Sequence, residues 1–219
     1  MTLLSKKVVA VIPAYNEGKT VRKVAAELKK VVDEVIVVND CSTDNTAKEA
    51  GQAGAVVLNH TQNGGYDKSI DDGFKKAAEL GADIIFTIDA DGEHKVSDVP
   101  RLLAPILDGS ADIVVSQRPY TTHFAEKIFA VYTNLRYGIK DPLCGLKAYR
   151  RSVYDTVGHF DTVQSIGTEL MIKGAAKGFK LKLIPIEILS RVDDTSRFYK
   201  RRFRANIKIL KAMFRVLSA

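Results

Sequence analysis

The sequence IIFTIDADGEH, at residues 84–94, combines the pattern of a buried strand with a polar end. It is a largely apolar run that ends in two carboxylates, Asp89 and Asp91, with Ala90 between them. Short apolar runs of this kind are typical of strands buried on both faces, as in a parallel sheet covered by helices. Ligands of such sheets bind beyond the carboxyl ends of the strands. The stretch therefore predicts a buried strand with a polar site at its end.

Strand and helix patterns alternate around this stretch. In chain order they cover Val8–Ile12, Thr20–Val32, Glu34–Val38, Asn45–Ala53, Ala55–Leu58, Ser69–Leu80, Asp83–Asp89, Ser97–Leu107 and Asp112–Ser116. β-branched runs that alternate with helical patterns predict βαβ units. The expected fold class is α/β, a Rossmann-like, mostly parallel sheet flanked by helices.

The alternation changes after Ser116. The patterns that follow predict a helix, a strand, two helices and a last strand, at Ala125–Tyr137, Gly145–Tyr149, Arg151–Val157, Gly167–Lys177 and Lys180–Ile186. No Pro/Gly-rich linker separates this half from the first. We expect both halves to share one sheet.

Composition and charge narrow the class of protein. With 219 residues and 46% hydrophobic content, the chain is the size of one domain with a proper core. Its formal charge of +7 lies wholly in residues 191–219, which hold nine Lys or Arg and two Asp. A basic charge confined to one end predicts a local docking surface for a flat anionic partner and argues against nucleic acid.

Membrane spans, export and zinc are not expected. No apolar run approaches the roughly 18 residues that cross a bilayer, and the first residues lack the apolar core of a signal peptide. The two cysteines, Cys41 and Cys144, show neither a CxxC pair nor zinc spacing. We expect a cytoplasmic protein without a structural disulfide or zinc.

Polar residues follow three of the expected strands. The strand ends read PAYNE at 13–17, NDCSTD at 39–44 and DAD at 89–91. Carboxylate oxygens suit hard cations such as Mg²⁺ or Mn²⁺, so Asp89 and Asp91 are candidate ligands, with Glu93 favoured over His94 as a third. Residues of this kind also serve as ordinary turn and cap residues, which leaves a purely structural role open.

The order of these motifs resembles family 2 glycosyltransferases of the GT-A fold. The resemblance rests on IPAYNE at 12–17, VVNDCSTD at 37–44, NGG at 63–65 and DADGEH at 89–94. Within that family, DPLCGLKAYR at 141–150 is similar to a segment of dolichol-phosphate mannose synthases and related polyprenyl-phosphate glycosyltransferases. The resemblance to the family covers roughly residues 7–200.

The resemblance implies a nucleotide-sugar donor site with a divalent cation. The residues that it implies for the donor are Pro13, Ala14, Tyr15, Glu17, Asp40, Asn63, Lys68, Asp89, Ala90 and Asp91. The cation, Mg²⁺ or Mn²⁺, would be held by Asp89, Asp91 and Glu93, although Gln is more familiar at position 93.

The resemblance also implies residues on the acceptor side. Arg118, Lys140 and Cys144 would lie at the acceptor phosphate, where Ser is more usual at position 144, and Arg191 and Arg197 would belong to a loop over the diphosphate. Glu169, at the start of an expected helix, is a candidate general base for a hydroxyl acceptor. A helix start favours Glu for structural reasons as well.

A basic amphipathic helix is expected at the C-terminal end. Its apolar positions recur every three or four residues, at Phe203, Ile207, Leu210, Phe214 and Leu217. Basic residues follow a neighbouring stripe, at Arg201, Arg204, Lys208, Lys211 and Arg215. Such a helix can lie on an anionic membrane or pack on the domain or on a second subunit, as in a homodimer.

These observations favour an inverting glycosyltransferase that moves a hexose from a GDP- or UDP-sugar to a polyprenyl phosphate. The catalytic residues would be Asp91, Arg118 and Glu169. The expected domain spans residues 1–195, with a nucleotide-sugar-binding half at 1–118 and an acceptor half at 119–195, followed by the helix at 196–219. A hydroxyl acceptor, with Glu169 as base, or a non-catalytic nucleotide-sugar-binding scaffold remains an alternative.

Overall fold

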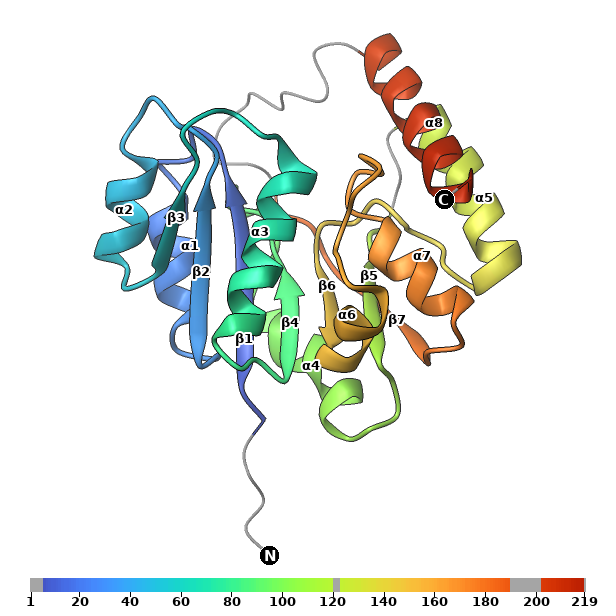
Figure 1. The fold of residues 1–219 in the computed structure, drawn as a ribbon, viewed down its shortest axis with the longest axis horizontal. Coiled ribbons are helices and arrows are strands. Elements are labelled where there is room, and N and C mark those ends of the chain that lie inside the picture. The colour runs from blue at the N-terminus through green and yellow to red at the C-terminus, as the bar shows by residue number, and fades with distance from the viewer. Residues whose placement is uncertain (1–5, 120–122, 190–201, 219) are drawn as a thin grey trace, which may run out of the picture.

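Seven strands form a single sheet in the computed structural model, which describes residues 6–119, 123–189 and 202–218. The strand order is β3-β2-β1-β4-β6-β5-β7 (Figure 1). The strands are β1 (Val8–Ala14), β2 (Glu34–Asn39), β3 (Val56–Asn59), β4 (Ile84–Thr87), β5 (Ile113–Gln117), β6 (Lys147–Arg150) and β7 (Leu181–Pro185). Strands from both halves of the chain therefore share one sheet, as expected.

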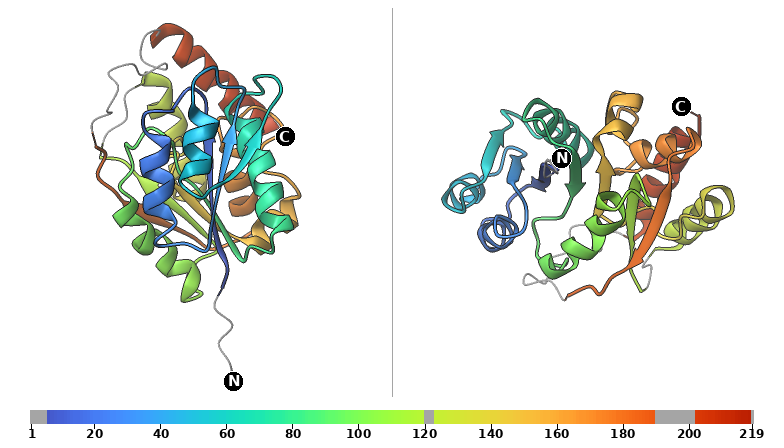
Figure 2. Two further views of the ribbon diagram at one scale, coloured as in Figure 1. Left: turned by 90° about the vertical axis from the view of Figure 1, so that its left-hand side faces the viewer. Right: turned by 90° about the horizontal axis from the view of Figure 1, so that it is seen from below.

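Helices cover both faces of this sheet (Figure 2). They are α1 (Val21–Leu28), α2 (Thr46–Gln52), α3 (Tyr66–Glu79), the 3₁₀ turn η1 (Val96–Asp98), α4 (Val99–Leu107), α5 (Phe124–Tyr137), α6 (Arg151–Val157), α7 (Glu169–Ala176) and α8 (Arg202–Ser218). α1, α2 and α4 pack on one face, while α3 and α5–α8 pack on the other. The expected α/β sandwich is confirmed.

β1 shows why its sequence forms a central strand. Its side chains alternate between the two apolar clusters, with Val9 and Val11 on the side of α3 and Ala10 and Ile12 on the side of α1. All four are fully buried. An unbroken apolar run is therefore what a strand covered on both faces requires.

The direction of the strands changes once, at β6. β1 pairs in parallel with β2 and with β4, whereas β6 runs antiparallel to both of its neighbours, β4 and β5. Successive connections leave β1 toward β2 and β3 on one side and toward β4 on the other. This change in the direction of the connections opens a crevice between the carboxyl ends of β1 and β4, where open α/β sheets bind their ligands.

The apolar stripe expected on the C-terminal helix is partly wrong. α8 lies beside α5 (Figure 1) and buries Ala205, Ile209, Ala212, Met213 and Val216. Ile209, Met213 and Val216 belong to the apolar cluster on that face of the sheet. Two of the expected stripe residues, Ile207 and Phe214, are instead exposed. None of the helices in the described ranges combines the length and the apolar character that crossing a membrane demands.

Candidate active site

A cavity of about 560 Å³ lies at the carboxyl ends of β1, β2 and β4. Most of the residues predicted for the site line it: Pro13, Ala14, Tyr15, Glu17, Asp40, Asn63, Asp89, Ala90, Asp91, Glu93 and Arg118. The lining crosses the sheet from the loops after β1 and β2, past the residues after β4, to the end of β5. Segments far apart in the sequence thus form one site.

Hydrogen bonds tie the loop after β1 to the loop after β2. The Asn16 N–H donates to Ser42 Oγ at 2.9 Å, and the Thr43 N–H donates to Asn16 Oδ1 at 2.8 Å. The Glu17 N–H donates to Thr46 Oγ1 at 2.8 Å. Much of the polar sequence in both motifs therefore holds the loops together, while Tyr15 and Glu17 line the cavity.

Asp40 lines the cavity and binds the loop at residues 63–65. Its carboxylate accepts the N–H groups of Gly64 and Gly65 at 2.7 and 2.8 Å and contacts His60 Nδ1 at 2.8 Å. The Asn63 amide donates to the Asp40 backbone carbonyl at 3.3 Å. Asp40 therefore organises the loop 63–65 and, with it, this part of the cavity wall.

Asp89 sits against a glycine that leaves no room for a side chain. A Cβ placed on Gly145 would lie 2.2 Å from Asp89 Oδ2, and Thr87 Oγ1 donates to the Gly145 carbonyl at 2.6 Å. The approach of β6 to β4 therefore holds the Asp89 carboxylate in place. On the other side, the Glu93 N–H donates to Asp91 Oδ1 at 3.0 Å.

His94 supports Asp89 from below the cavity. It is buried, its Nε2 lies 3.5 Å from Asp89 Oδ2, and it is absent from the cavity lining, whereas Glu93 is present. Burial opposes protonation of His94, but the three neighbouring carboxylates, led by Asp89, raise its pKa overall. The preference for Glu93 over His94 as a candidate ligand fits this geometry.

The donor set after β4 suits a hard divalent cation. The described residues contain no group of three or more His, Cys, Asp or Glu side chains arranged to hold a metal by themselves. Mg²⁺ in nucleotide sites commonly takes one or two carboxylates and completes its shell with phosphate oxygens and water. Asp89 and Asp91, both facing the cavity, meet that requirement.

Arg118 lies at the opposite end of the cavity in a two-pronged ion pair. Its Nε and one terminal nitrogen each donate to the Asp141 carboxylate at 2.8 Å, and Glu126 Oε1 lies 4.0 Å away. Burial alone would lower the pKa of Arg118, but its hydrogen bonds to the Asp141 carboxylate raise that pKa above its ordinary value. Arg118 is therefore a fixed cation beside His123 and Glu126 in the cavity wall.

Three residues predicted for the site lie away from the cavity lining. Lys68 pairs with Asp72 along α3, Lys140 is exposed after α5, and Cys144 is buried beside the lining residues. Burial raises the pKa of the Cys144 thiol to about 12, so it stays protonated. Arg191 and Arg197 fall outside the described residues.

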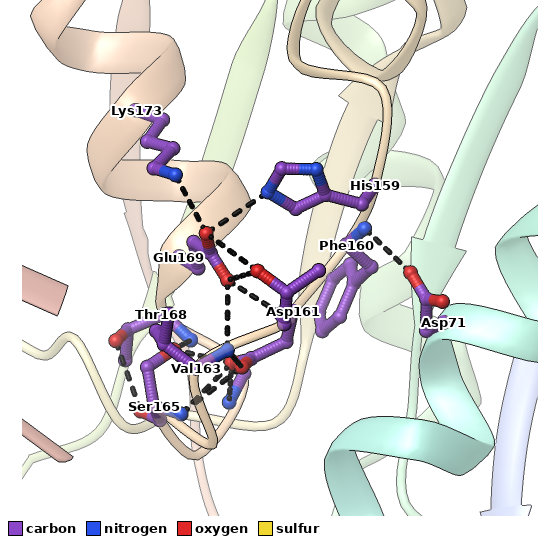
Figure 3. Close-up of polar contacts among 11 residues, drawn as sticks. Asp71, His159, Phe160, Asp161, Val163, Ser165, Thr168, Glu169 and Lys173 are labelled. Carbon is purple, nitrogen blue, oxygen red and sulfur yellow. Dashed lines mark hydrogen bonds and ion pairs between the residues drawn. The ribbon is translucent and has the colours of Figure 1, made fainter. Parts of the chain in front are cut away.

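Glu169 has a structural environment instead of the open position that a general base requires (Figure 3). It is fully buried, and its carboxylate contacts Lys173 Nζ at 2.7 Å and His159 Nε2 at 2.9 Å and accepts the Thr162 N–H at 2.5 Å. Burial alone would raise its pKa, but these contacts lower it to about 2. Glu169 also lies outside the cavity lining, and this position argues against its expected role as base.

Sequence reasoning did not predict several residues that line the cavity, and two of them, Asp67 and Lys208, are charged residues on helices. Asp67, at the start of α3, lines the cavity and accepts the Gly167 N–H at 2.6 Å, which ties α3 to the loop before α7. Burial and the nearby Asp161 raise the pKa of Asp67 to about 6. Lys208 of α8 also lines the cavity. Neither belongs to a motif that points to it, and only the packing brings them in.

An α/β sheet with paired carboxylates at this crevice agrees with the class of nucleotide-dependent transferases that the sequence predicts. The model of the family described as Glycosyl transferase family 2 matches residues 9–158. The chain belongs to this family.

Two relatives show which members of the family this chain is similar to. It is 32% identical over 180 residues to the UDP-N-acetylglucosamine–dolichyl-phosphate N-acetylglucosaminyltransferase of Methanococcus voltae, which covers 68% of this chain and 72% of that protein. It is 27% identical over 208 residues to the undecaprenyl-phosphate mannosyltransferase of Micrococcus luteus, covering 84% of each.

A solved structure shows the same fold. Glucosyl-3-phosphoglycerate synthase from Mycobacterium tuberculosis, in complex with Mn²⁺ and UDP-glucose, superimposes with a TM-score of 0.74 at 20% identity. The match covers 95% of this chain and 79% of that chain. The GT-A fold expected from the sequence is thereby confirmed.

We predict that Gly145→Ala weakens metal binding without unfolding the protein. The added Cβ would displace the Asp89 carboxylate, and disturbing the support of a ligand typically costs 10- to 100-fold in affinity. Electron paramagnetic resonance of Mn²⁺ in the presence of a nucleoside diphosphate measures this affinity. Gly51→Ala is the control, because its Cβ meets nothing within 4 Å. Equal affinity in both variants would contradict the prediction.

We predict that Glu169→Gln lowers stability but leaves turnover nearly unchanged. Loss of the buried carboxylate should cost about 1–3 kcal/mol in urea unfolding at pH 7. Because the pKa of Glu169 is lowered from 4.5 to about 2, its contribution should be complete above pH 4.5 and fade as the pH falls toward 2. The gap between wild type and variant should close over that range.

Glu79→Gln on the surface of α3 is the control for stability and should change it little. A catalytic base would behave differently, with turnover falling by about 100-fold or more in Glu169→Gln. That outcome would reinstate the role as base.

Proposed function

We propose that this protein transfers a hexose from a GDP- or UDP-sugar to a polyprenyl phosphate, with inversion at the anomeric carbon. One observation carries the proposal. The carboxylates of Asp89, Asp91 and Glu93 face a cavity. The loops after β1 and β2, which are proposed to hold the nucleoside, line one end of it, and the fixed cation Arg118 lines the other. The two relatives named above act on polyprenyl phosphates, which supports this acceptor class.

The donor lies across the loops after β1 and β2 in this proposal. Tyr15, Asp40 and Asn63 would form the wall for the nucleoside, and Asp89 and Asp91 would hold Mg²⁺ or Mn²⁺. When bound, the cation neutralises charge on the departing diphosphate. The loops after β1 and β2 keep the nucleoside oriented because hydrogen bonds from the backbone of each loop to a side chain of the other tie them together.

The acceptor enters from the side of β5 and α5. An oxygen of its phosphate forms the new bond to the anomeric carbon while the bond from that carbon to the nucleoside diphosphate breaks. The acceptor oxygen is already ionised, so no strong base is needed, which agrees with the buried, ion-paired Glu169. Positioning and charge stabilisation then supply most of the catalysis.

We predict glycolipid formation when the purified protein is incubated with Mg²⁺ or Mn²⁺, a panel of GDP- and UDP-sugars and a short polyprenyl phosphate. Asp91→Ala should reduce the rate by about 100-fold or more, because it removes a ligand of the cation that stabilises the leaving group. Product is followed by thin-layer chromatography or mass spectrometry.

Asp108→Ala is the matched control, because Asp108 lies at the exposed end of α4, outside the cavity lining. Its rate should equal that of the wild type. Donor hydrolysis or donor binding without glycolipid over the whole panel would reject the lipid phosphate as acceptor.

We further propose that the pair α5–α8 holds the protein peripherally at the cytoplasmic face of a membrane, where such an acceptor resides. Along α5, Phe124, Ile128, Val131 and Leu135 are exposed at spacings of three and four and form one apolar stripe, and Leu135 is 83% exposed. Ile207 and Phe214 add exposed apolar surface on α8. The membrane contact expected of the C-terminal helix is thus extended to α5.

Charge supports an anionic lipid surface over a second subunit as the partner of this pair. Exposed basic residues accompany the apolar stripe on both helices: Lys127, Arg136, Arg204, Lys211 and Arg215. Each basic residue near an anionic bilayer contributes about 1 kcal/mol of attraction, whereas two copies of one basic surface repel each other.

We predict that the double variant Val131→Glu/Leu135→Glu loses most binding to vesicles of phosphatidylglycerol and phosphatidylcholine, because it places charge in the apolar contact. Vesicle co-sedimentation measures the bound fraction. Leu107→Glu, an exposed leucine at the end of α4, should bind as the wild type does. Unchanged vesicle binding, with a dimer-to-monomer shift in analytical ultracentrifugation, would assign the surface to a homodimer instead.

A further inference from the structure

The charges that line the cavity are strongly unbalanced. Seven acidic side chains face it: Glu17, Asp40, Asp67, Asp89, Asp91, Glu93 and Glu126. Among the described residues, the lining holds two Lys or Arg side chains, Arg118 and Lys208. A cavity with this balance attracts cations and repels the phosphates of a donor and an acceptor alike. Each basic side chain in the lining therefore matters for binding anions.

Arg118 has much of its charge engaged within the protein. Its guanidinium forms the two-pronged pair with Asp141, which is 2% exposed, and lies near Glu126 as well. A guanidinium held in this way keeps its position but offers fewer donors to a ligand. Lys208 adds a second cation to the lining, a compact ammonium on a flexible stem that has three rotatable donors.

The packing of α8 brings Lys208 to the β5 end of the cavity. Ile209, the next residue, is fully buried, and the preceding Asn206 accepts the Ala125 N–H at the start of α5 through its Oδ1 at 2.8 Å. These contacts fix the turn of α8 that carries Lys208. The charge of Lys208 also reaches Asp67, whose pKa it lowers against the larger effects of burial and Asp161.

The strand order separates this end from the donor end. Residues for the nucleoside follow β1 and β2, the carboxylates for the cation follow β4, and Arg118 and Lys208 come from β5 and α8 beyond them. An anion held by Lys208 therefore lies on the far side of the metal-binding carboxylates from the nucleoside. That place belongs to the acceptor.

We propose that Lys208 binds the anionic group of the acceptor, a phosphate monoester, and so couples the docked C-terminal helix to the chemistry of the cavity. This inference rests on the proposed function. It gives α8 two roles. The helix packs beside α5 and exposes the apolar side chains of Ile207 and Phe214, and its Lys208 completes the acceptor site. Loss of α8 from its place would remove a substrate contact as well as membrane attraction.

The test compares Lys208→Ala with Lys211→Ala, because both remove one positive charge from α8 but Lys211 is absent from the cavity lining. The acceptor is a short, water-soluble prenyl phosphate, so that membrane binding does not affect the rates. Lys208→Ala should raise the KM for this acceptor by about 10- to 100-fold, the range for a lost hydrogen bond to a charged group. The donor KM should change less than about twofold, because no donor contact is removed.

Lys211→Ala should match the wild type in both KM values, and Lys208→Arg should recover most of the loss because it keeps the charge. Thermal unfolding of each variant checks folding. Equal acceptor KM values for Lys208→Ala and Lys211→Ala, or a rise confined to the donor KM, would overturn the proposal.

A wild type that forms no glycolipid would reject the proposed function first. Calorimetric titration with the same prenyl phosphate then decides the role of Lys208. Binding to the wild type and to Lys211→Ala that disappears in Lys208→Ala supports the anion site without transfer, whereas no binding to the wild type overturns it.

Discussion

The close approach of Gly145 to Asp89 is the constraint on which the site depends. The carboxylate can occupy its position only because the residue opposite has no side chain, as a Cβ there would lie 2.2 Å from an oxygen. That approach exists because β6, which begins two residues after Gly145, enters the sheet antiparallel between β4 and β5. One reversed strand therefore links the two halves of the chain at a carboxylate that lines the cavity.

Much of this arrangement could be predicted from the sequence. The order of strands and helices follows from local periodicity, and the polar ends of three strands meet at one edge because parallel strands end there together. The errors come from packing that no local pattern records. A Glu at a helix start can be exposed or buried, and the sequence does not decide which. Lys173 is the i,i+4 neighbour of Glu169 on the same helix, but the burial of Glu169 and its contact with His159, which lies outside α7, follow from packing.

The C-terminal helix shows a second limit of periodicity. Large apolar residues defined the expected stripe, whereas the buried face of α8 includes the small residues Ala205 and Ala212, which allow close contact with the domain. The result leaves Ile207 and Phe214 outside and turns Lys208 toward the cavity. A pattern that weighs only large side chains misplaces the face of a helix that packs through alanines.

The excess of acidic side chains explains why the site needs partners from outside the motifs. A nucleoside diphosphate and a phosphate monoester together bring several negative charges to a lining that already repels them. Within the described chain, a buried amine partly offsets this field: Lys147 lies beneath the site and donates to the Gly167 carbonyl at 2.7 Å. Burial lowers the pKa of Lys147 to about 8, so its charge is costly to keep. Cations at the surface of the cavity cost less, because they remain partly hydrated until an anion arrives. The divalent ion proposed for Asp89 and Asp91, together with the proposed anion contact of Lys208, would meet that need.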